Sequence, residues 1–271
     1  VIGYNAMSGN FTTAVVNDVV AIGSGALAGT LTADATGTTV VGTAAGAAIT
    51  SGQKNTAVGY GALTAETDGD FSVAVGYNAL AASTGKNGTS ANVAVGYSAG
   101  SAITSGSSNT IVGYLAGDAI DTMTDNTAIG AGALGGSSAV DKTVVIGSGA
   151  GAGAMTSGAD GTIAIGYQAG AAITSGAFNT AVGYQALVTN ATESNGVAVG
   201  YQALRYNVGG HNVAIGYLAG SGSGSATSSG ASNVTIGSSA GNGLTTGSNN
   251  ISIGSGAGKT STTGGQNICI G

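Results

Sequence analysis

The chain has 271 residues, of which 53 are glycine, none is proline and only 6% are charged, and its formal net charge is −6. Five basic residues leave no patch that could neutralise nucleic-acid phosphates. No apolar run approaches the roughly 20 residues of a membrane helix, and a single cysteine excludes an internal disulfide. We therefore expect no nucleic-acid partner and no membrane insertion in this segment.

One short motif organises the whole chain. Sixteen glycines, each preceded by Val or Ile, recur at spacings that are most often 17 residues, and Ala stands three residues after each glycine in the fifteen complete copies. Such a period is typical of stacked repeat architectures. We expect one array of about 15 coils over residues 1–271, belonging to a longer fibrous protein because both ends lie inside a repeat.

A short strand is predicted before each repeat glycine, which we number position 0. Positions −3 and −1 carry β-branched residues, a period-two pattern that indicates a strand. Position −4 is usually Asn, which favours turns and can form hydrogen-bonded ladders when it is stacked in register. In chain order, the clearest examples are residues 55–60, 92–97, 109–114, 126–131, 179–184, 212–217 and 250–255.

Two kinds of coil follow the glycine. Some continue as Ala-Leu, as at Ala62-Leu63, and others as Ala-Gly with an Ile later, as at Ala45-Gly46 and Ile49. We expect the early Leu or the late Ile to plug the coil interior. Seventeen residues suffice for two short strands and two turns, and insertions within 31–39, 83–90 and 221–230 are expected to form loops.

The strand has one branched aliphatic face and one face of Ala and Gly. We expect position −1 to fill the core and the glycine to admit a second backbone, from the coil itself or from another chain. This glycine seam comprises Gly23, Gly42, Gly59, Gly76, Gly96, Gly113, Gly130, Gly147, Gly166, Gly183, Gly200, Gly216, Gly237 and Gly254.

The pattern Asn-x-[Val/Ala]-x-[Val/Ile]-Gly resembles the head repeats of YadA-like trimeric autotransporter adhesins. The strings "NTAVGYQAL" at 179–187 and "IAIGYQAG" at 163–170 resemble bacteriophage tail-fibre repeats more closely. The resemblance implies an all-β parallel β-solenoid of the left-handed β-roll type, in which three chains pack around an axis as a homotrimer. Coils of 17 residues and the Tyr after the glycine depart from the shorter adhesin period and favour the fibre.

Oligomerisation is also expected on physical grounds. A flat coil encloses little volume, so an isolated stack is marginally stable. Its aliphatic face and its Ala/Gly face cannot both fill one small interior, and a homotrimer would bury the face left outside. The sequence leaves open which face that is.

A tyrosine row is the main candidate for ligand binding. Tyrosines directly after the glycine are expected to stack, either as a structural ladder or as a candidate strip that binds glycans of a host surface. The strip comprises Tyr60, Tyr77, Tyr97, Tyr114, Tyr167, Tyr184, Tyr201 and Tyr217.

Other chemistry is weakly indicated. Asp118, Asp121 and Asp125 could bind Ca²⁺, but they do not recur in other coils, so solvated loop charges are the preferred interpretation. The chain lacks a phosphate loop, and its single histidine, His211, gives no credible Ser–His–Asp set. We expect no enzyme, no cofactor and no metal.

The sequence therefore predicts a structural fibre, the rod of a phage tail fibre or a similar filament, outside the cell, at its surface or on a virion. Two alternatives stay open. One is a trimeric adhesin head that binds host glycans or matrix protein, and the other is a surface filament that assembles end to end.

Overall fold

The computed structural model describes residues 1–9, 16–32, 35–85, 90–222 and 228–271. It is an all-β parallel β-solenoid of about 14 turns with about 17 residues in each coil, as the period predicted. The chain forms two compact units, Val1–Ala139 and Val140–Gly271.

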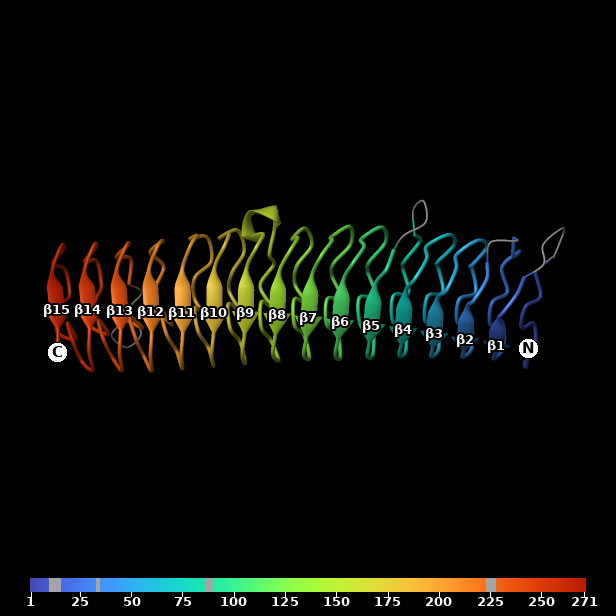
Figure 1. Cartoon of the computed structure of the whole chain (residues 1–271), viewed down its shortest axis with the longest axis horizontal. Coiled ribbons are helices and arrows are strands. Elements are labelled where there is room, and N and C mark those ends of the chain that lie inside the picture. The colour runs from blue at the N-terminus through green and yellow to red at the C-terminus, as the bar shows by residue number, and fades with distance from the viewer. Residues whose placement is uncertain (10–15, 33–34, 86–89, 223–227) are drawn as a thin grey trace. The chain divides into compact units, whose positions relative to one another are not determined.

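The first unit carries one short strand in each coil (Figure 1). Each strand pairs in parallel with the next, and equivalent repeat positions lie side by side, as Ala57 does with Ala74. Its strands are β1 (Val20–Ile22), β2 (Thr39–Val41), β3 (Thr56–Val58), β4 (Val73–Val75), β5 (Val93–Val95), β6 (Thr110–Val112) and β7 (Thr127–Ile129).

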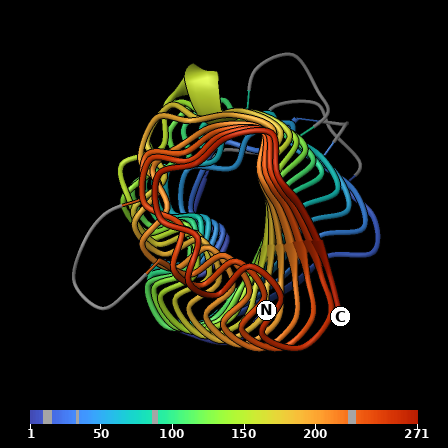
Figure 2. The same cartoon turned by 90° about the vertical axis from the view of Figure 1, so that its left-hand side faces the viewer.

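The second unit repeats this arrangement. Its register is again position on position, as Ala181 on Ala198, and a short 3-10 helix, η1 (Ser157–Ala159), lies between its first two strands. The strands are β8 (Val144–Ile146), β9 (Ile163–Ile165), β10 (Thr180–Val182), β11 (Val197–Val199), β12 (Val213–Ile215), β13 (Val234–Ile236), β14 (Ile251–Ile253) and β15 (Ile268–Ile270). Viewed end on, successive coils follow similar closed outlines (Figure 2).

The strand turns its small side inward, which contradicts our expectation that position −1 fills the core. In β3, Ala57 is fully buried while Thr56 and Val58 are partly exposed, and β10 shows the same pattern. The reason is space: most coils leave room for only a small side chain beside the plug, and the larger Val40, Ile111 and Val145 are buried at position −2 in coils that carry Gly at position +4. The branched residues therefore lie on the outer face of the sheet.

The interior is filled by residues that follow the glycine, as predicted. The Ala at position +3 is buried in coil after coil, and the plug is either an early Leu such as Leu63 and Leu187 or a late Ile such as Ile49 and Ile173, all fully buried. In the Ile coils, position +4 is Gly because a Cβ there would press on the plug: at Gly170 it would lie 2.9 Å from Cδ1 of Ile173. Leu and Ile thus fill the same space from different positions.

Each coil has one strand where we expected up to two. Between strands, the described residues of a coil form turns and irregular segments, and the backbone there still bonds coil to coil, as Leu63 N does to Ala79 O at 3.1 Å. The loops expected within 31–39, 83–90 and 221–230 include residues 33–34, 86–89 and 223–227, which lie outside the described residues. No helix in the described part of the chain is long and apolar enough to cross a membrane.

Candidate assembly and binding surfaces

The glycine seam is a backbone-to-backbone contact between consecutive coils of one chain. Within each unit, a Cβ added to a seam glycine would collide with the carbonyl oxygen of the next seam glycine, as Gly59 would with Gly76. These glycines also adopt φ values that L residues rarely reach, +135° at Gly59. The second backbone that the sequence predicted here is therefore the next coil.

The asparagines at position −4 form a buried ladder. The backbone N and the side-chain Nδ2 of Asn109 donate to Oδ1 of Asn92 at 3.0 and 3.1 Å, and the same Nδ2 donates to Met123 O at 2.8 Å. Asn250 repeats the contacts on Asn233. The amides of Asn109 and Asn250 thus bond to the coil before and to a turn of the coil after, which explains why Asn is used at this enclosed corner.

The tyrosines stack into two ladders. Neighbouring ring centroids lie 5.1 to 5.3 Å apart and the ring planes differ by 7 to 20°. The first unit holds the ladder Tyr60, Tyr77, Tyr97 and Tyr114, and the second holds Tyr167, Tyr184, Tyr201 and Tyr217.

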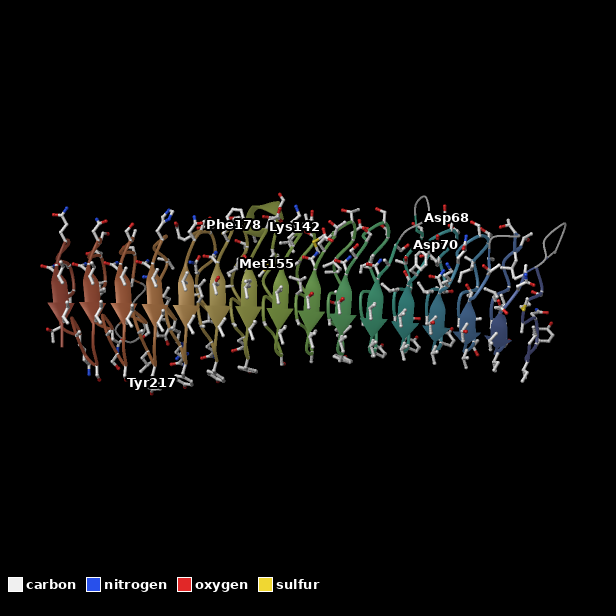
Figure 3. All side chains as sticks on the ribbon, in the orientation of Figure 1. Asp68, Asp70, Lys142, Met155, Phe178 and Tyr217 are labelled. Atoms are coloured by element: carbon white, nitrogen blue, oxygen red, sulfur yellow. The ribbon has the colours of Figure 1, made fainter. Side chains whose placement is uncertain are left out.

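Stacking decides which part of each ring solvent can reach. The tyrosine residues remain 43 to 58% exposed, but an inner ring such as Tyr184 has a neighbour on both faces. Solvent therefore meets ring edges and hydroxyls. In the second unit, Tyr217 lies just beyond the end of its strand, on the side of the coil opposite Lys142 and Phe178 (Figure 3).

A glutamine ladder beside the second tyrosine ladder was not predicted. Nε2 of Gln185 donates to Oε1 of Gln168 at 2.8 Å, and Nε2 of Gln202 donates to Oε1 of Gln185 at 2.9 Å. The signal was present in the sequence, since "YQA" recurs at 167–169, 184–186 and 201–203. The ladder ties the tyrosine turns of three coils together.

The outer face of the strands, which we call the aliphatic face, is a regular surface. It consists of positions −3 and −1 of every described strand, and each of these residues is Val, Ile or Thr. Many are about a third exposed or more, including Val95 at 36% and Ile215 at 42%. Two uncharged, β-branched rows thus run across the sheet of each unit.

The acidic residues considered for Ca²⁺ do not converge. Asp121 accepts a hydrogen bond from the Thr104 hydroxyl, and burial raises the pKa of Asp118 above its usual value against the opposing effect of a backbone hydrogen bond. Among the described residues, no group of three or more His, Cys, Asp or Glu side chains is arranged to hold a metal ion, and no pocket is found. The candidate surfaces are therefore the extended rows.

Comparison with known proteins adds no family. No protein-family model matches the chain, and no curated protein matches it either. The resemblance to adhesin heads and tail fibres thus rests on the repeat pattern, and the functional argument rests on the surfaces described above.

Proposed function

We propose that this chain is a structural fibre protein, the rod of a phage tail fibre or a similar extracellular filament, and that it works as a homotrimer rather than as an enzyme. The observation that carries the proposal is the aliphatic face. Buried alanines, plugs and polar side chains fill the interior of the coils, and the branched rows lie outside it. Exposed, contiguous apolar surface of this kind marks an interface.

The size of the face sets the area available for association between copies. With strands about 4.8 Å apart and two rows spanning about 10 Å with their side chains, each unit presents on the order of 300 Å². In a ring each chain divides the faces of its two units between two neighbours, so each contact lies below the roughly 800 Å² per partner of a standard interface. The two rows differ in position, so row −1 of one chain can pack on row −3 of the next, a heterologous contact that closes into a ring.

The first test is the oligomeric mass. Sedimentation equilibrium of the 271-residue chain should give three times 25.1 kDa. Val182→Asp places a charge in the aliphatic face and should shift the mass toward one chain while the coil remains folded. The matched control is Ser108→Lys, at an exposed corner where other coils carry Lys54 and Lys142, and it should leave the mass unchanged.

Other masses would count against the trimer. A wild-type chain that stays monomeric, or a Val182→Asp chain that stays trimeric, contradicts the proposed interface. An open series of masses that grows with concentration would instead support the end-to-end filament.

The second candidate function is an adhesin head that binds host glycans, and the exposed tyrosine ladders favour it. Because neighbours cover the faces of the inner rings, a sugar would meet hydroxyls and ring edges. Replacing Tyr184 and Tyr201 by Phe keeps the stack but removes two hydroxyls. If the ladder binds glycans, glycan-array signals should fall about tenfold or more, which corresponds to the loss of one or two hydrogen bonds. Unchanged signals would rule out this use of the hydroxyls.

A further inference from the structure

The tyrosine ladders have a property that neither proposed function uses. In each ladder, phenol rings lie nearly parallel at 5.1 to 5.3 Å, and each ring is attached to a different coil. The hydroxyl edges are open to solvent. We propose that each ladder is a site of oxidative cross-linking, at which a one-electron oxidant joins tyrosines of neighbouring coils as dityrosine.

The chemistry needs two phenols held together and an oxidant. A haem peroxidase with hydrogen peroxide takes one electron and one hydroxyl proton from each of two tyrosines. The two phenoxyl radicals join through ring carbons next to the hydroxyl-bearing carbon, and the hydrogens on those carbons move to the oxygens as the rings regain aromaticity. The chain loses two hydrogens in all, and the peroxide becomes two waters.

The geometry favours this pairing over others. A phenoxyl radical formed at Tyr77 has a phenol on each side, at 5.2 Å toward Tyr60 and 5.1 Å toward Tyr97. Stacked backbones hold these neighbours in place, since Asn78 N donates to Tyr60 O at 2.8 Å and Ser98 N donates to Tyr77 O at 2.8 Å. Coupling within the ladder therefore needs only side-chain movement.

Two tyrosines outside the ladders provide internal controls. Tyr4 is 79% exposed, but the next coil has Ser24 at the equivalent position, so the ladder does not extend to it. Tyr206 is not stacked on another described tyrosine, and the Arg205 guanidinium lies 4.8 Å from its ring centroid. If exposure alone governed coupling, Tyr4 would react most.

A cross-link here would join coils that backbone ladders already align. Coupling of Tyr60 to Tyr77 closes a loop of 17 residues, and a covalent loop of this size restricts the unfolded chain. The cross-linked protein should consequently melt at a higher temperature than the untreated protein. The consequence does not depend on whether the chain is a fibre or an adhesin.

The experiment treats the full chain with peroxidase and hydrogen peroxide and maps the products by mass spectrometry. A mixture of isotope-labelled and unlabelled chains separates cross-links within a chain from those between chains. We expect dityrosine within one chain between ladder neighbours, a loss of two hydrogens for each cross-link, and a yield that does not depend on protein concentration.

The matched variants are phenylalanine substitutions, which keep the rings. Tyr77→Phe should abolish two of the three neighbour cross-links of the first ladder and leave the one between Tyr97 and Tyr114. Tyr4→Phe should leave the ladder cross-links unchanged. The proposal is overturned if no dityrosine forms, if cross-links join mainly different chains, or if Tyr4 and Tyr206 react as readily as the ladder.

Discussion

At the scale of single residues, the seam glycines show how close the coils come. The prediction concerns Gly59→Ala: the new Cβ would meet Gly76 O, and φ of +135° is strained for alanine. We expect a loss of about 3 kcal/mol or more in the free energy of unfolding, from backbone strain and overpacking combined. Urea unfolding of the full chain measures it.

The control for that substitution is a glycine with open space around it and a φ that other residue types adopt. A Cβ at Gly132 would meet nothing within 4 Å, and its φ of +63° is one that Asn78 and Gln168 adopt at the same repeat position. Gly132→Ala should cost about 1 kcal/mol, the ordinary penalty of the left-handed region. Equal losses for the two variants would mean that coil-to-coil contact does not set the requirement for glycine.

At the scale of the element, coils with a Leu plug and coils with an Ile plug differ at two positions together, +4 and +7. Leu187 at position +4 accompanies a buried Asn190 at +7, whereas Gly170 at +4 accompanies Ile173 at +7. Leu187→Gly alone should leave a cavity and cost about 3 to 5 kcal/mol, and Asn190→Ile alone should overpack the interior by about 1 to 3 kcal/mol.

The double variant tests whether one space is shared. It converts the coil to the Ile kind, and Gly suits the φ of +54° that Leu187 adopts. In a double-mutant cycle, its loss in the free energy of unfolding should therefore be smaller than the sum of the two single losses by about 2 kcal/mol or more. Additive losses would show that the two plugs occupy separate sites.

Much of the coil was predictable from its sequence, and its orientation was not. Residues 55–63 predicted the strand, the Asn55 corner and the Leu63 plug, because period-two branching, turn chemistry and apolar spacing are local signals. The inward face was predicted wrongly, because hydrophobicity favours burying Val58 over Ala57. The deciding quantity, the width left beside the plug, depends on the closed coil and cannot be read from a strand of three residues.

At the scale of the whole molecule, the inward orientation of position −2 decides whether an introduced charge affects association or folding. On the outer face, Val182→Asp should act on association, as proposed above, whereas Ala181→Asp places an unpaired charge where a fully buried methyl group lies. That substitution should cost well over about 3 kcal/mol and unfold its part of the array. The sequence shows which residues recur in rows. Which side chains bond between coils, as the Gln168 and Gln185 amides do, can be predicted only once the register of the coils is known.

The register also affects how the number of repeats can change in the gene. Because equivalent positions lie on one another, an unequal genetic exchange that removes residues 60–76 joins Gly59 to Tyr77 and leaves every remaining coil with its usual sequence around it. The ring of Tyr77 then occupies the place that Tyr60 held, still next to Tyr97. A gene built this way can lengthen or shorten its product by whole coils in a single event, so descendants can vary in reach while each keeps the same local chemistry.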